Sequence, residues 1–97
     1  MAKRTPKQQT KHDNIVKETA QYYKSQDYKV EADIKGFNSP STINGRRPDV
    51  VAKKAGRMVI VEVETRDSLI KDKSQQKVFQ NYAEKHKNVR FLTKIAK

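Results

Sequence analysis

The sequence predicts a small α/β domain, in which a mixed β-sheet is flanked by helices and the elements follow the order α-β-β-β-α-β. Three observations predict it. Apolar residues follow helical spacing after residue 13, they alternate with polar ones over residues 28–35 and 57–65, and helical spacing returns around residues 75–86. Alternation places successive side chains on opposite faces of a strand, whereas a helical face repeats every three or four residues. A chain of 97 residues has room for one modest core, so residues 13–97 are expected to form a single domain.

The first helix is expected to begin at Asp13 or Asn14, because either side chain can cap the free N–H groups of a helix start. Its apolar face is formed by Ile15, Val16, Thr19, Ala20, Tyr22 and Tyr23. Residues 1–12 are polar and basic, contain Pro6 and show no periodicity, which indicates a disordered basic tail. His12 falls in this tail and receives no role.

Three strands are expected next, over residues 28–34, 47–53 and 57–65, and the turn signal Asn44-Gly45 precedes the second of them. In the third strand, Glu62 and Glu64 share a face with Ile60, and the opposite face is made of valines. A second helix is expected from about residue 68, with Gln75 and Phe79 on its inward face. A final strand begins near residue 89.

The composition is strongly basic, with 22 Lys and Arg against 11 Asp and Glu and a formal charge of +11. Residues 1–12 account for only four of these positive charges, so the rest of the chain is also basic. Nucleic acid is the expected partner, because cations that neutralise phosphates release counterions. The alternative is a lysine-rich surface that only maintains solubility.

Several classes of protein are excluded or disfavoured by what the sequence lacks. No apolar run approaches the roughly 20 residues that span a bilayer, so no membrane partner is expected. The first residues lack the apolar stretch of a signal peptide, and the chain contains no cysteine, which excludes disulfides and thiolate zinc sites. A cytoplasmic, intracellular location is therefore expected.

Three carboxylates gather on neighbouring strands, and this is the feature that points to chemistry. Asp49 lies near the start of the second strand, while Glu62 and Glu64 lie two residues apart on one face of the third. Such acids repel one another unless a cation lies between them, and hard ions such as Mg²⁺ bind carboxylate oxygens while keeping several waters. In a basic protein, gathered acids favour metal-assisted cutting of a nucleic acid.

The pattern Pro48-Asp49, twelve intervening residues and then Glu62-Val63-Glu64 resembles the PD-(D/E)XK nuclease superfamily, which has a restriction-endonuclease-like fold. Within it, the likeness is closest to small archaeal Holliday-junction resolvases, and it covers most of residues 13–93. The resemblance implies a Mg²⁺- or Mn²⁺-dependent endodeoxyribonuclease, in which Asp49, Glu62 and the carbonyl of Val63 bind the metal.

The resemblance also implies roles for two helical residues. Glu18 would approach from the first helix and bind the metal directly or through water, and Gln75 resembles a polar helix residue that some branches place near the metal. Each also has a purely structural interpretation. Glu18 would be a surface acid paired with a neighbouring lysine, and Gln75 would be a buried amide bonded to backbone.

Glu64 departs from the family pattern, because it stands where the motif normally has lysine. Glu64 would be a further ligand or a general base, another lysine would take the missing role, or the site would be weakened or inactive. Lys71 and Lys53 are the candidate replacements, whereas helical spacing turns Lys77 away.

The strand acids have a structural alternative as well. Asp49 would pair with Arg46 or Arg47 at a loop-to-strand junction, and Glu62 and Glu64 would line a solvent-facing strand compensated by lysines.

Five cations are expected to cluster around the acids and to bind phosphates: Arg46, Arg47, Lys53, Lys54 and Arg57. The sequence therefore predicts a metal-dependent DNA endonuclease, structure-selective or junction-resolving in its most specific form, with RNA not excluded. The alternative is a catalytically weakened or inactive nucleic-acid-binding module on the same fold. A homodimer is expected, because a chain this small does not encircle a duplex and two cuts need two sites.

Overall fold

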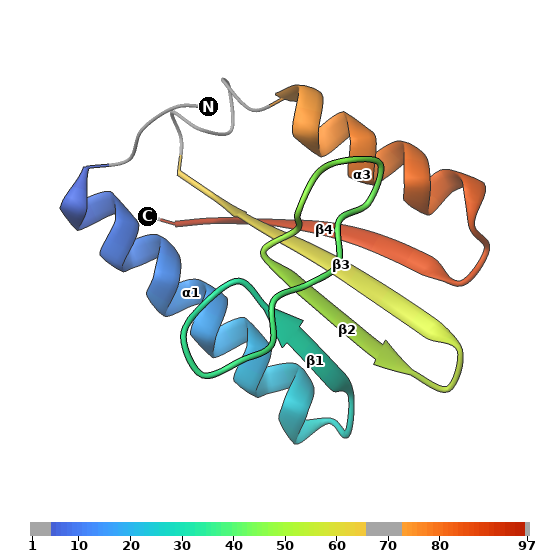
Figure 1. Ribbon diagram of the computed structural model, residues 1–97, viewed down its shortest axis with the longest axis horizontal. Coiled ribbons are helices and arrows are strands. Elements are labelled where there is room, and N and C mark those ends of the chain that lie inside the picture. The colour runs from blue at the N-terminus through green and yellow to red at the C-terminus, as the bar shows by residue number, and fades with distance from the viewer. Residues whose placement is uncertain (1–4, 66–72, 97) are drawn as a thin grey trace.

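A computed structural model describes residues 5–65 and 73–96 (Figure 1). In chain order, its elements are α1 (Pro6–Ser25), β1 (Lys29–Ala32), β2 (Val50–Lys54), β3 (Arg57–Glu64), α3 (Lys73–Lys85) and β4 (Val89–Ile95). The strands form one sheet in the order β1-β2-β3-β4. The predicted α/β class and the order αβββαβ are confirmed.

The sheet is mixed, as predicted. β2 is antiparallel to both β1 and β3, whereas β4 runs parallel to β3. Ala55 and Gly56 connect β2 to β3 with φ angles of 51° and 79°, the positive values that a two-residue hairpin turn requires. The parallel return from β3 to β4 needs a longer crossover, and α3 lies on that path.

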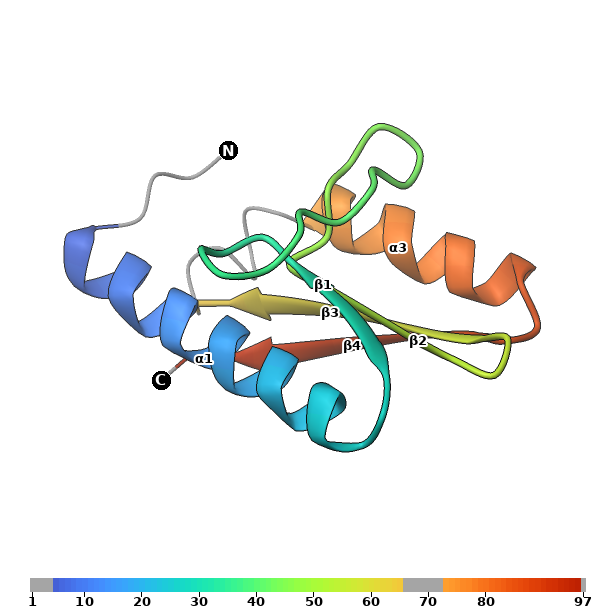
Figure 2. The ribbon, with the colours of Figure 1, turned by 60° about the horizontal axis from the view of Figure 1, so that its bottom comes forward.

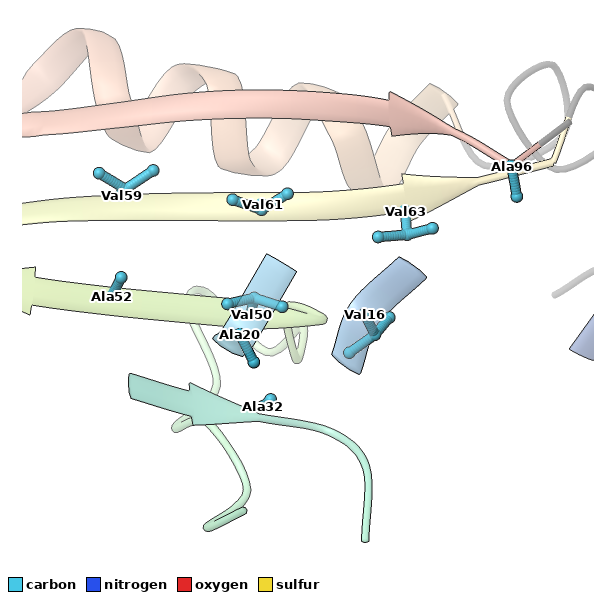
Figure 3. Packing of buried hydrophobic residues seen from close by; sticks show 9 residues of the cluster. All are labelled: Val16, Ala20, Ala32, Val50, Ala52, Val59, Val61, Val63 and Ala96. Carbon is cyan, nitrogen blue, oxygen red and sulfur yellow. The ribbon is translucent and has the colours of Figure 1, made fainter. Parts of the chain in front are cut away.

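Two layers of helix and loop cover the two faces of the sheet (Figure 2). α1 packs on one face, where the alternate valines of β3 meet Val16 and Ala20 of the helix (Figure 3). α3 and the loop between β1 and β2 lie on the other face, where Phe79 and Ile43 pack around Ile60. The alternation of β3 therefore assigns its residues to two separate clusters, as the sequence predicted.

The first helix begins earlier than predicted. Thr5 is its N-cap: the Thr5 hydroxyl accepts a bond from the Gln8 N–H at 3.1 Å, and the Gln8 side chain accepts one from the Thr5 N–H at 3.0 Å. Pro6 occupies the first turn, where its missing N–H costs nothing. The predicted disordered tail is therefore wrong for residues 6–12, as is a helix start at Asp13 or Asn14; residues 1–4 lie outside the described part.

Within residues 5–65 and 73–96, neither helix is both long and apolar enough to cross a membrane. The edge strand β4 is less covered than its neighbours: α1 packs mainly against β1, β2 and β3, and Leu92 of β4 is 38% exposed.

The contrast between Phe79 and Leu92 yields a stability prediction. Phe79 is fully buried, with its ring centre 6.0 Å from that of Phe91, so Phe79→Ala should lower the free energy of unfolding by about 3–5 kcal/mol. Leu92→Ala removes a partly exposed apolar side chain and should cost less than about 1 kcal/mol. Urea unfolding followed by circular dichroism measures both, and equal losses would contradict the assigned core.

Candidate active site

The register of the β2–β3 hairpin brings Asp49 and Glu62 together. Val50 pairs with Val61, so Asp49, one residue before β2, lies across from Glu62. The two side chains are hydrogen-bonded to each other. Asp49 Oδ2 also accepts a 2.8 Å bond from the backbone N–H of Val63, which anchors the carboxylate against the edge of β3. The meeting of two acids from adjacent strands is therefore observed, and their catalytic and metal-binding roles remain predictions.

Burial decides how this pair is charged. Glu62 is only 2% exposed, and its burial together with the negative charge of Asp49 raises its pKa to about 10. Burial also acts to raise the pKa of Asp49, but hydrogen bonds from His12 and Glu62 outweigh it and bring that pKa below its ordinary value. At neutral pH, Glu62 thus holds a proton that it donates to the Asp49 carboxylate.

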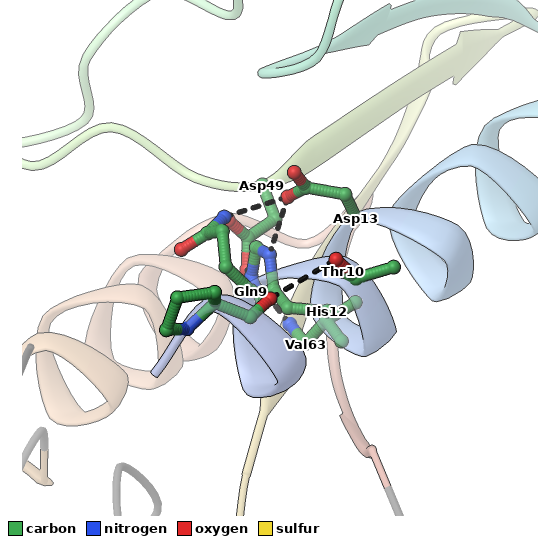
Figure 4. Close-up of polar contacts among 7 residues, drawn as sticks. Gln9, Thr10, His12, Asp13, Asp49 and Val63 are labelled. Atoms are coloured by element: carbon green, nitrogen blue, oxygen red, sulfur yellow. Dashed lines mark hydrogen bonds and ion pairs between the residues drawn. The ribbon is translucent and has the colours of Figure 1, made fainter. Parts of the chain in front are cut away.

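His12 of α1 is the functional candidate that the sequence analysis missed. It is 4% exposed, and its Nε2 lies 3.2 Å from Asp49 Oδ2, while its Nδ1 lies 3.1 Å from Asp13 Oδ1 (Figure 4). Gln9 Nε2 donates to the same Asp13 oxygen at 2.7 Å. A histidine ring donates from both nitrogens only when both carry protons, so these two contacts favour the imidazolium form.

A sequence signal for His12 did exist. The Thr5-Pro6-x-Gln8 stretch has the form of a capping box with proline in the first turn, which predicts a helix start before His12. Once the helix is extended back, His12 falls one turn before Val16 on the buried face. A disordered tail over residues 1–12 would leave His12 outside the helix, so that interpretation gave no reason to place it beside Val16.

Gln75 of α3 reaches the pair from the opposite face of the sheet. Its Nε2 donates to Glu62 Oε1 at 3.2 Å, which places the amide on the acid. His12 of α1 therefore contacts one acid of the pair and Gln75 of α3 contacts the other, from the two helices that cover opposite faces of the sheet. This is the position near the acids that the resemblance implied for Gln75.

Glu18 lies away from the site, contrary to the prediction. It is exposed on α1, six residues after His12, and six residues turn a helix by about 240° beyond a full turn. His12 holds the helix position that faces the acids, so Glu18 points elsewhere.

Glu64, the last residue of β3, is 1% exposed and lies on the same face as Glu62, whose pKa its charge helps to raise. The solvent-facing alternative for Glu62 and Glu64 is therefore wrong. Of the lysines considered as replacements, Lys77 is exposed on α3 and Lys71 lies outside the described residues.

The predicted basic cluster is divided between two ends of the sheet. Lys53, Lys54 and Arg57 flank the hairpin turn, whereas the acids lie at the other end of the same strands. Glu62 lies five positions after Arg57, which is about 17 Å along an extended strand. The expectation that Lys53 reaches the acids, or that these three surround them, is wrong.

Arg46 and Arg47 remain near the acids. Both are exposed in the loop that leads into Asp49, and Arg46 pairs with Ile43 in an isolated β-bridge. Of the five cations predicted to bind phosphates, these two lie within three residues of Asp49 in the chain.

The donor set fits a metal that keeps water and substrate ligands. Among residues 5–65 and 73–96, no group of three or more His, Cys, Asp or Glu side chains is arranged to hold a metal ion. Mg²⁺, however, is commonly held by one or two carboxylates together with waters and phosphate oxygens. Because the N–H and C=O of a strand residue point to the same side, the Val63 carbonyl lies on the edge that faces Asp49. Asp49, Glu62 and this carbonyl form a suitable oxygen set.

The sequence of this chain matches the model of one known protein family. The model of the AHJR-like family, described as REase_AHJR-like, matches residues 3–97, which is nearly the whole chain. Comparison with curated proteins gives no match.

The raised pKa of Glu62 yields a prediction for stability against pH. Folded protein keeps this proton up to about pH 10, whereas the unfolded chain loses it near the ordinary pKa of 4.5. The unfolded state binds fewer protons within this window, so the free energy of unfolding falls as pH rises. Relative to Glu62→Gln, wild type in EDTA should lose roughly 1 kcal/mol per pH unit between about pH 6 and 8.

Urea unfolding at several pH values measures this difference. The lowered pKa of Asp49 does not change this difference between pH 6 and 8. Its contribution to the free energy of unfolding is lost only in acid, below the ordinary pKa of 3.8. Parallel pH profiles for wild type and Glu62→Gln would contradict a buried, protonated Glu62.

Proposed function

Because the chain belongs to the AHJR-like family of restriction-endonuclease-like proteins, we propose that it is a metal-dependent DNA endonuclease that hydrolyses phosphodiester bonds. This membership agrees with the PD-(D/E)XK resemblance of its sequence. The observation that carries the proposal is the buried Asp49–Glu62 pair on adjacent strands. A protein that only binds nucleic acid gains nothing from acids placed close to phosphate.

In this proposal, Asp49, Glu62 and the Val63 carbonyl hold Mg²⁺ or Mn²⁺, which when bound lowers the pKa of a water and offsets charge on the phosphoryl oxygens. The protein supplies the geometry. The Val63 N–H and His12 fix the Asp49 carboxylate, and the Gln75 amide fixes Glu62. To serve as a ligand, Glu62 would have to release its shared proton to solvent, because only the ionised carboxylate binds a metal well.

His12 provides a cationic partner for the acids in a motif that lacks its lysine. The carboxylate of Glu64 cannot supply positive charge, whereas an imidazolium bound to Asp49 and Asp13 can. In this proposal, Glu64 acts as a further ligand or as a general base.

The high positive charge supports DNA as the substrate, and it is equally compatible with RNA. Branched DNA and a homodimer belong to the same proposal, because symmetric cutting of a junction needs two sites. We also propose that the protein is intracellular, because its proposed substrate, nucleic acid, is found inside the cell.

A second candidate function is a nucleic-acid-binding module that does not cut. Glu64 favours it, because a buried acid replaces the lysine of the family motif. The two candidates predict the same binding and differ only in cleavage.

The deciding assay measures cleavage of labelled four-way junction, flap and linear DNA with Mg²⁺, Mn²⁺ or EDTA. We expect metal-dependent cutting that falls by about 100-fold or more in Asp49→Asn and in Glu62→Gln, since loss of even a second-sphere partner of a metal ligand costs about 10–100-fold. Glu18→Gln is the matched control, an exposed acid that should leave the rate unchanged. Binding of all substrates with no cutting by wild type would make the binding module the better answer.

The role of His12 has its own test. His12→Ala should lower kcat about 10–100-fold with little change in KM, because it removes one of the hydrogen-bond partners that orient the proposed metal ligand Asp49. His12→Gln, which retains an N–H donor, should recover part of the loss. His86→Gln changes an exposed histidine and serves as control. Equal rates for wild type and His12→Ala would contradict the role.

A further inference from the structure

A groove of about 370 Å³ lies at the hairpin end of the sheet, away from the acids. It is formed by the first residues of β3, the turn before β4 and the first residues of β4, together with Tyr28. Three of its lining residues are the exposed cations Arg57, Lys87 and Arg90, and no acid is among the residues that line it. The lining of the groove is therefore positively charged.

The groove opens on the face of the sheet that α1 covers only in part. Arg90 pairs with Val59 in the parallel register, so its side chain lies on the same face as that valine, which packs in the α1 cluster. Leu92 follows on the same face of β4 and is 38% exposed. An extended ligand can thus reach the cations along the uncovered edge strand.

Aromatic side chains border the same region. Tyr28 lines the groove, and its ring centre lies 5.1 Å from that of Tyr23. Tyr22 packs on Tyr23 at 5.2 Å and is 57% exposed. Positive grooves beside aromatic side chains are typical of surfaces that follow a nucleic-acid backbone.

We infer that this groove binds the phosphate backbone of the nucleic acid at a position remote from the acid pair. Arg57, Lys87 and Arg90 line one groove, and a phosphate backbone offers regularly spaced anions for such cations. The inference rests on the proposed function for its choice of nucleic acid as the polyanion. It adds a second contact region, located at the opposite end of β3.

The separation of the two regions restricts the substrate class. Glu62 and Arg57 lie five positions apart on β3, about 17 Å. Along the axis of a DNA duplex, this distance corresponds to about five phosphates of one DNA strand. A substrate that occupies both regions must extend several nucleotides beyond the cleaved bond. Long or branched nucleic acid meets this condition, whereas a short oligonucleotide does not.

The test compares two triple variants that remove the same charge. The groove variant combines Arg57→Gln, Lys87→Gln and Arg90→Gln. The control variant combines Lys17→Gln, Lys35→Gln and Lys77→Gln, three exposed cations that do not line the groove. Fluorescence anisotropy with a labelled 20-base-pair duplex, in EDTA and over a range of salt concentrations, gives the slope of log K against log salt for each protein. Circular dichroism establishes that each is folded.

We expect the groove variant to lose about three from the magnitude of that slope, close to one for each phosphate contact, and the control to lose less than about one. Equal losses on the duplex would overturn the inference and assign binding to overall charge. Because the assay contains no metal and measures no cleavage, failure of the groove and failure of the nuclease proposal appear in separate experiments.

Discussion

The antiparallel register of β2 on β3 is the constraint on which the site depends. Val50 opposite Val61 places Asp49 across from Glu62, and the same register sends the valines of β3 into the α1 cluster. A slip of one residue would exchange the two faces, burying Glu62 under α1 and exposing the valines to the acid side. The positive φ angles of Ala55 and Gly56 hold the hairpin in this register. The core and the acid pair are therefore specified by one set of strand contacts.

Burying acids at the end of a sheet is costly unless other groups compensate. Here the two helical layers do so from opposite faces: His12 of α1 bonds to Asp49, and Gln75 of α3 bonds to Glu62. The shared proton removes one negative charge from the pair. In the proposed nuclease, a metal ion would take over from this proton in offsetting the negative charge of the two acids.

Charge is separated along the same hairpin. The acids lie at the end where β3 finishes, and the cations Lys53, Lys54 and Arg57 lie at the turn where it begins. Lys54 is partly engaged in the fold, since its Nζ donates to the Gln26 carbonyl at 2.8 Å. The proposed metal site and the proposed polyanion-binding groove therefore lie at different ends of β3, so the charges of one do not cancel those of the other.

The sequence by itself determined the order of elements, the two faces of β3 and the pairing of Asp49 with Glu62, because alternation and a short hairpin act between residues close in the chain. The sequence also contains the signal for a helix start at Thr5, because a capping box is formed by residues close in the chain. Tertiary structure alone decided that His12 rather than Glu18 meets the acids, and that Arg57 joins Lys87 and Arg90 instead of the site. These choices depend on how helix phase and strand direction bring distant segments together. Local sequence patterns do not predict these contacts, because they form only when the helices pack on the sheet.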